Sequence, residues 1–191
     1  MVLELTEKQE AVLDATLELI GERGFHGTPM SAIAEKAGVG AGTIYRYYES
    51  KEELINALYI REKQAINAQV LEGYSEDLSV RDAVGLMFRN AINARACQSA
   101  RFRFLDQYYN SPFIGDESRR IREQLIAEYV EIIERGVRNG EIRDLPRPVV
   151  MAMIFGPLAQ LVNAGQLKDV TLDDELIEQV LDAIWRGIGC E

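Results

Sequence analysis

The chain has 191 residues, of which 47% are hydrophobic, and a formal net charge of -10. This composition supports a sizeable core and argues against intrinsic disorder. The single histidine excludes most histidine-based catalytic and metal sites. The two cysteines lie far apart in the sequence without a metal-ligand pattern, so they imply no disulfide framework. We therefore expect no metal and no cofactor.

The longest uncharged apolar run, residues 149–162, is shorter than the roughly 20 residues that a membrane helix needs. No charged-then-apolar leader follows Met1, so we expect no signal peptide, no membrane partner and a cytoplasmic location. The negative net charge is unfavourable for binding nucleic acid, because phosphate neutralisation supplies much of that affinity. However, residues 25–51 hold three basic and two acidic side chains, so the charge excludes no local DNA-binding face.

Nearly every segment has the apolar spacing of a helix, and none alternates for long enough to indicate a sheet. Residues 7–23 carry an apolar stripe, whereas the opposite face repeats an acidic residue every four positions. Like charges at this spacing destabilise an isolated helix, so packing must hold this one. Gly24 is a good stop signal for the helix. The acidic residues are Glu10, Asp14, Glu18 and Glu22.

Two short helices are expected next, joined by a glycine-containing turn at residues 38–40. Thr28 can cap the first with its hydroxyl, and Pro29 suits its first position because no N–H is needed there. The second runs from about Ala41 to Tyr47. Two short helices joined in this way indicate a helix-turn-helix unit, whose second helix enters the major groove of DNA.

The remaining segments continue the helical pattern. Ser50 and Glu53 form a capping-box pattern that opens a long helix, residues 73–78 are the expected hinge, and Ser79 and Asp82 open the next helix. Further helices are expected over residues 99–109 and 121–137. The next begins at residue 146 or 148 and ends at 162, with a kink at Pro157. Thr171 and Asp174 open the last helix, which ends at residue 188. The sum is an all-α fold of about nine helices.

The second short helix offers the chemistry of a DNA reader. Its first residues, Gly40, Ala41 and Gly42, are small enough to let the backbone approach base edges closely. Thr43 can bond a phosphate or contact a thymine methyl group. Arg46 is the only charged side chain on this helix, and arginine can bond guanine with two hydrogen bonds. We expect Ile44 to face inward, against Ile33 and Val39.

These residues carry a resemblance to a known family. The segment from Thr28 to Leu54 resembles the DNA-binding domain of the tetracycline-repressor (TetR) family. The matching patterns are G-F-x-G-T at 24–28, I-A-x-x-A-G-V at 33–39, G-T-I-Y-x-Y-Y at 42–48 and S-K-E-E-L at 50–54. The match covers residues 8–55. It implies a helix-turn-helix DNA-binding domain over residues 1–53 and a helical ligand-binding and dimerisation domain over residues 54–191.

The resemblance also implies roles for single residues. Thr28 would bond a phosphate at the start of the first short helix, and Lys51 would bond another at the start of the long helix. Thr43, Tyr45 and Tyr47 would touch phosphates and bases. Simpler alternatives stay open: the tyrosines of this segment, including Tyr48, can be packing residues, and Arg46 and Lys51 can be plain surface side chains. The acidic residues before Lys8 supply no basic arm for the minor groove.

The second domain would bind a small molecule and a second copy of the chain. Aromatic and methionine side chains suit an apolar pocket, although at helical spacing they also suit a plain core. One of the six arginines within residues 95–122 can pair with an anionic ligand. The last two helices, from Val149 and from Leu172, are the most apolar, so they either form a four-helix homodimer interface or fill the monomer core. The pocket candidates are Met87, Phe88, Phe102, Phe104, Tyr108, Tyr109, Phe113, Met151 and Phe155.

We therefore expect a ligand-responsive transcriptional regulator. It would be a repressor that binds palindromic double-stranded operator DNA as a dimer and is released by a small-molecule effector. An activator is a close rival, because the sign of regulation depends on where the operator lies. An enzyme is not expected, since paired acids such as Asp173 and Asp174 lie at helix starts, where they complement the helix dipole. A helical adaptor that binds a protein partner through its acidic surface also stays open.

Overall fold

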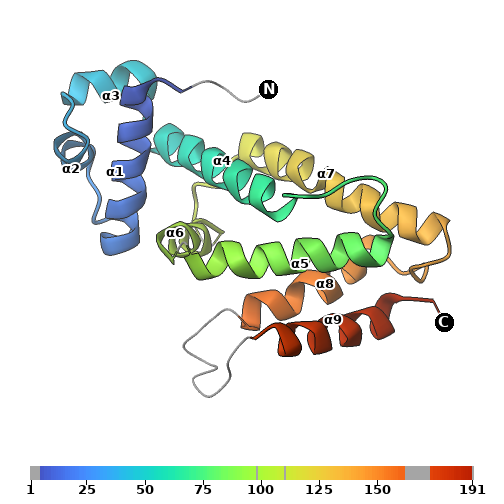
Figure 1. Cartoon of the computed structure of the whole chain (residues 1–191). Coiled ribbons are helices and arrows are strands. Elements are labelled where there is room, and N and C mark those ends of the chain that lie inside the picture. The colour runs from blue at the N-terminus through green and yellow to red at the C-terminus, as the bar shows by residue number, and fades with distance from the viewer. Residues whose placement is uncertain (1–4, 98, 110, 162–172, 191) are drawn as a thin grey trace. The chain divides into compact units, whose positions relative to one another are not determined.

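The computed structural model describes residues 5–97, 99–109, 111–161 and 173–190, and these residues form nine α-helices without a β-strand. An isolated antiparallel bridge pairs Ile142 with Gly189. The all-α prediction is therefore confirmed for the described part of the chain (Figure 1). The helices are α1 (Glu7–Arg23), α2 (Met30–Lys36), α3 (Ala41–Tyr47), α4 (Lys51–Val70), α5 (Val80–Cys97), α6 (Ser99–Tyr109), α7 (Asp116–Arg138), α8 (Arg147–Leu161) and α9 (Asp174–Ile188).

The helix boundaries follow local stop and start signals. Gly24 ends α1 with a φ of 68°, a left-handed conformation that favours glycine. The Asp173 carboxylate caps α9 by accepting a hydrogen bond from the Leu176 N–H at 2.9 Å. The expected start at Thr171 and end at Val162 both lie outside the described residues.

One capping prediction is wrong. Pro29 is the N-cap of α2 rather than its first residue, and no side chain caps this helix. The Thr28 hydroxyl instead donates back to the Gly24 carbonyl at 2.9 Å, because the turn after α1 brings that carbonyl within reach. Helix α7 is also longer than expected, starting at Asp116 rather than at Ile121.

The chain divides into two compact units, each with its own core. The first joins residues 1–64 with 98–122, and the second joins residues 65–97 with 123–191. In the first unit, α1 packs against α2, α3 and α6. The helix-turn-helix segment therefore shares a core with α6, which comes some fifty residues later in the chain. The division into a DNA-binding and a ligand-binding domain at residue 53 stays a prediction.

The second unit is built on α5, α8 and α9, which pack against one another in pairs. The segment after α4, which we expected to be a hinge, is held by hydrogen bonds from side chains of this unit. The Asn90 amide donates to the carbonyls of Val70 at 3.1 Å and Glu72 at 2.9 Å. The Arg135 guanidinium donates to the carbonyls of Glu76 and Leu78. Side chains from α5 and α7 thus hold the backbone of this connection.

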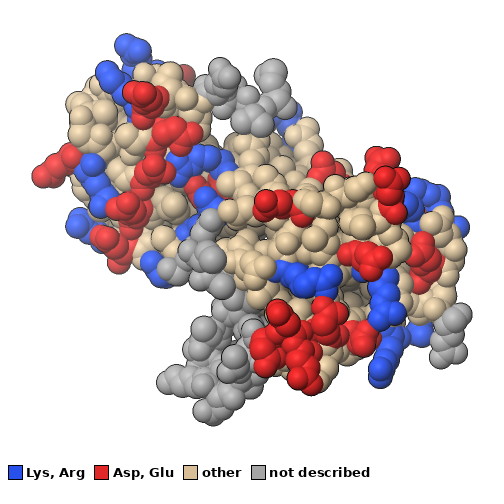
Figure 2. Space-filling model, in the orientation of Figure 1, with Lys and Arg blue, Asp and Glu red and all other residues tan. Residues whose placement is uncertain are grey.

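The acidic face of α1 is neutralised by cations from other helices. Figure 2 shows the band of acidic side chains along this helix. Lys36 of α2 lies 2.6 Å from Glu18, and the Arg61 guanidinium of α4 lies 2.7 Å from Glu10 and 2.8 Å from Asp14. The like-charge repulsion expected from the sequence is therefore offset by ion pairs as well as by packing.

Candidate nucleic-acid interface

Helix α3 is anchored by Ile44 and leaves four of its seven residues exposed. Ile44 and Ile33 have no exposed surface, so they anchor α3 and α2 in the core, as predicted. Gly38, with a φ of 67°, makes the turn between the two helices. Ala41, Gly42, Tyr45 and Arg46 are exposed, and Tyr45 retains 53% of its surface. The core-facing anchor therefore presents the start of α3 to solvent.

Two glycines at the start of α3 have no role inside the fold. Gly40 has an ordinary φ of -70°, and a Cβ placed there would come no closer than 3.9 Å to the Thr43 hydroxyl. A Cβ at Gly42 would meet nothing within 4 Å. By contrast, a Cβ at Gly27 would lie 2.5 Å from the Arg23 carbonyl oxygen, so the fold itself requires that glycine. Glycine at positions 40 and 42 fits close approach by a molecule from outside.

The tyrosines of this segment have different surroundings. Tyr47 is half-buried, and the Arg46 guanidinium lies 5.4 Å from the centre of its ring. This contact holds the arginine beside the exposed face of α3. Tyr48 is only 5% exposed, which fits a packing residue, and burial raises the pKa of its hydroxyl. Thr43 is half-buried.

Thr28 and Lys51 already have partners within the protein. Thr28 is fully buried, with its hydroxyl on the Gly24 carbonyl, and the Lys51 ammonium donates to the Phe25 carbonyl. Partial burial lowers the pKa of Lys51. Both side chains brace the loop between α1 and α2. A phosphate contact by either side chain would have to add to these bonds or replace them.

Two family models together match residues 12–190 of the chain. The family model for bacterial regulatory proteins of the tetR family matches residues 12–58. The model for the tetracyclin repressor-like C-terminal domain matches residues 59–190. The chain belongs to the TetR family. It is a DNA-binding transcriptional regulator, as the sequence predicted, and TetR-family members are regulators rather than enzymes.

Several relatives span the full length. The fatty acid metabolism regulator protein of Bacillus subtilis is 26% identical over 195 residues, covering 95% of both chains. The regulator RutR of Escherichia coli K12 is 26% identical, covering 96% of this chain and 92% of its own. A TetR-family regulator from Marinobacter aquaeolei VT8 shares the fold, with a TM-score of 0.87, 24% identity and 97% of both chains covered. FadR of Bacillus subtilis, solved in complex with stearoyl-CoA, has a TM-score of 0.74 at 25% identity and covers 94% of this chain and 98% of its own.

The predicted pocket residues fall in both units, and one of those in the first, Tyr108, lies in a polar cluster. Tyr108 is buried, and its hydroxyl lies 2.7 Å from both the Asn56 carbonyl oxygen and the Ser118 hydroxyl. Its ring stacks on Tyr59 at 4.1 Å. Nothing local in the sequence marks Tyr59, Asn56 and Ser118 as neighbours of Tyr108, so these three residues were not predicted. Of the other candidates here, Phe104 is buried, Phe102 and Phe113 are half-buried and Tyr109 is exposed.

A small cavity lies beside this tyrosine cluster. Its volume is about 10 Å³, enough for one water molecule, and two arginines of α7, Arg119 and Arg122, contribute to its wall. A separate open cleft of about 570 Å³ lies in the same unit, with Phe113 and the lone histidine, His26, among its lining residues. Neither by itself identifies an effector site.

The candidates in the second unit belong to its hydrophobic core. Met87 and Phe88 are fully buried there, whereas Met151 and Phe155 of α8 are half-buried against it. The ring of Phe155 lies 5.7 Å from that of Tyr129. Among the described residues, no group of three or more histidine, cysteine, aspartate or glutamate side chains could hold a metal ion. None of the described helices is long and apolar enough to cross a membrane.

Proposed function

We propose that this TetR-family regulator is a repressor that binds a palindromic operator as a homodimer and is released by a small-molecule effector. The observation that carries the DNA-reading part is the exposed start of α3. It has glycines that the fold does not require at positions 40 and 42, with Arg46 one turn further along. A backbone segment with glycine at these positions can approach base edges closely, and arginine–guanine hydrogen bonding is the commonest specific base contact.

The remaining contacts follow from the positions of the side chains. Tyr45 is exposed enough to reach a phosphate or a base, and Thr43 and Tyr47 lie beside it at partial exposure. Ala41 leaves room at the helix start, where backbone N–H groups favour a phosphate. Thr28 and Lys51 would act from the loop that they brace, Lys51 by sharing its charge between the Phe25 carbonyl and a phosphate.

A dimer through α8 and α9 is supported by apolar surface that the monomer leaves uncovered. The two helices lie side by side (Figure 1). Val149 of α8 is 43% exposed, and Met153, Val180 and Trp185 are only half-buried. Among the described side chains of α8, only Val150 and Ile154 are fully buried in the single chain. A second copy packed on this face would complete the burial and place two α3 helices on one DNA duplex.

The repressor and effector assignments draw on the relatives. KstR of Mycolicibacterium smegmatis is a transcriptional repressor, and it is 40% identical over 63 residues, covering 33% of this chain and 31% of its own. FadR of Bacillus subtilis binds stearoyl-CoA. In this chain, arginines 119 and 122 lie next to the tyrosine cluster. Acyl-CoA esters are therefore the first compounds to test, and the bacterial cytoplasm is where such a regulator would meet both DNA and effector.

The experiment is selection of bound duplexes from a random library at low salt. We expect a palindrome from the wild-type protein, and a relaxed preference at one position of each half-site from Arg46→Ala. The loss of one good arginine–guanine pair should cost about 1–3 kcal/mol of discrimination. Enrichment of no sequence by a folded, dimeric protein would contradict the proposal and favour the adaptor. An unchanged palindrome with Arg46→Ala would remove the base-reading role from this residue.

A further inference from the structure

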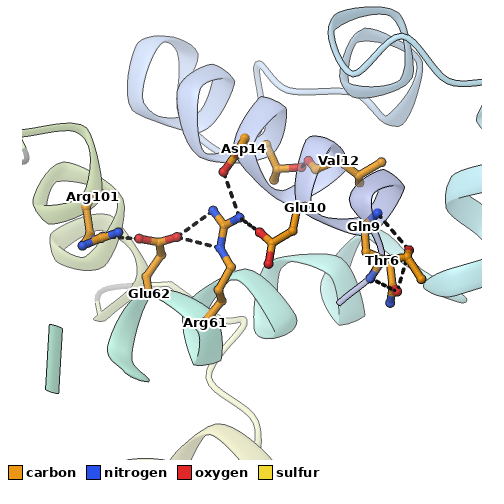
Figure 3. Close-up of polar contacts among 9 residues, drawn as sticks. Thr6, Gln9, Glu10, Val12, Asp14, Arg61, Glu62 and Arg101 are labelled. Atoms are coloured by element: carbon orange, nitrogen blue, oxygen red, sulfur yellow. Dashed lines mark hydrogen bonds and ion pairs between the residues drawn. The ribbon is translucent and has the colours of Figure 1, made fainter. Parts of the chain in front are cut away.

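Glu62 of α4 is a carboxylate with only 1% of its surface exposed, and it lies between two arginines. The guanidinium of its neighbour Arg61 contacts one carboxylate oxygen, with its Nε at 2.9 Å and a terminal nitrogen at 2.7 Å. The Nε of Arg101, on α6, donates to the other oxygen. Figure 3 shows the carboxylate between the two guanidinium groups. A buried charge is stable only when it is paired in this way.

Arg61 extends the cluster to a third helix. The same guanidinium that binds Glu62 also donates to Glu10 at 2.7 Å and to Asp14 at 2.8 Å, both on α1 (Figure 3). The cluster therefore contains three carboxylates and two guanidinium groups. Without Arg101, Arg61 alone would face all three acids. The buried carboxylate and the two acids of α1 would then compete for one cation.

Helix α1 carries the DNA-reading helices. It packs against α2 and α3 on the one hand and against α6 on the other. At Gly21 of α1 a Cβ would lie 4.0 Å from the Ala100 carbonyl oxygen of α6, the outer end of ordinary van der Waals contact. Any change in the charge balance at Glu10 and Asp14 therefore acts on the helix that supports α3.

We propose that Arg101, Glu62 and Arg61 form a relay that positions α1 according to the placement of α6. With Arg101 also paired to Glu62, the Arg61 guanidinium bonds Glu62 and the acidic face of α1 at the same time. When a movement of α6 takes Arg101 away from Glu62, the Arg61 guanidinium pairs with Glu62 instead of with α1. The repulsion between Glu10 and Asp14 then destabilises α1. The regulatory use of this relay rests on the proposed function, because α6 bears the predicted effector residues Phe104 and Tyr108.

The relay is tested in the full-length protein, without DNA or effector, by hydrogen exchange measured with mass spectrometry. Arg101→Met removes the charge and keeps most of the side-chain length. We expect the amides of α1 to exchange roughly 10- to 100-fold faster, because a buried carboxylate has lost its partner. Amides of α9 serve as the internal control and should not change. Arg119→Met is the matched variant, since it removes an exposed guanidinium from the same compact unit whose ion pair is with Asp116 of its own helix, and it should leave α1 at the wild-type rate.

The decisive variant is the double substitution Glu62→Gln with Arg101→Met. Glutamine needs no counter-charge, so Arg61 stays available to α1 and its exchange should return to within about 3-fold of wild type. Rescue of this kind separates charge balance from lost packing. The proposal is overturned if Arg101→Met leaves α1 unchanged, or if the double variant exchanges as fast as Arg101→Met. Should Arg101→Met fail to fold, a folded double variant supports the relay and an unfolded one overturns it.

A second readout connects the relay to DNA. On the palindrome selected by the wild-type protein, Arg101→Met should weaken binding by roughly 10-fold or more, and the double variant should restore it. Unchanged DNA affinity in Arg101→Met would overturn the positioning role. If the wild-type protein selects no DNA at all, the proposed function fails, whereas the exchange experiment still decides whether the relay exists.

Discussion

Substitution of Gly42 by alanine should have opposite effects on folding and on DNA binding. A Cβ at this position meets no atom of the protein within 4 Å, so the fold accepts it without strain. Alanine in place of a helical glycine stabilises by about 0.5–1 kcal/mol, which is about 1–4 °C in Tm for a chain of this size. On DNA, the same methyl group would enter the space between the α3 backbone and the base edges. Overpacking of a close contact costs about 1–3 kcal/mol, or about 5- to 150-fold in Kd.

Gly21→Ala is the matched control for this prediction. It changes a helical glycine of the same compact unit, at a position where the nearest atoms to the new Cβ lie 4.0 Å away. It should raise Tm by a similar amount and leave Kd for the selected palindrome unchanged. Differential scanning calorimetry and fluorescence anisotropy on both variants give the two numbers. If Gly42→Ala binds DNA like Gly21→Ala, the idea that glycine at position 42 serves a close approach to DNA is refuted.

Two further predictions concern tyrosines. The buried Tyr48 hydroxyl lies near Gln9 but makes no hydrogen bond of good geometry with the described residues. Tyr48→Phe should therefore leave stability unchanged or raise it by up to about 2 kcal/mol in chemical denaturation, and a clear loss would show that the contact with Gln9 is a stabilising hydrogen bond. Burial raises the pKa of Tyr129 well above its usual 10.0, so above pH 10 only the unfolded chain releases this proton and the free energy of unfolding falls. Tyr129→Phe should flatten that fall between about pH 10 and 11.5, and an unchanged slope would contradict this assignment.

The positions of the helices were predictable because their signals are local. The apolar stripe of α1 and its stop at Gly24 lie within one segment, and α3 and α6 have the bounds that the sequence suggested. The capping residue at Ser50 also acts locally, since its hydroxyl accepts from the Glu53 N–H at 3.1 Å. Thr28 was misjudged because its hydroxyl can either accept a hydrogen bond from an N–H of α2 or donate one to the Gly24 carbonyl, and only the folded turn decides between them.

The grouping of the helices could not be predicted in the same way. In the sequence, Glu62 is one of many polar residues on a long helix, and Arg101 is one of several arginines in a charged stretch. Their pairing depends on bringing together residues that lie 39 positions apart. The sequence indicated that packing must hold α1 against the repulsion on its acidic face, because nothing local places Arg61 beside that face. Long-range ion pairs have no periodicity, so they become visible only in the fold.

The distribution of charge bears on how this protein would bind DNA. Around α2 and α3, Lys36 is paired with Glu18 and Lys51 is bonded to a carbonyl, so little positive charge faces outward from these two side chains. Counter-ion release on phosphates should therefore contribute less than in a strongly basic reader. More of the affinity would then have to come from base contacts near Arg46 and from the use of two half-sites by a dimer. Such a reader depends on the spacing of its two α3 helices, and this makes the placement of α1 an effective point of control.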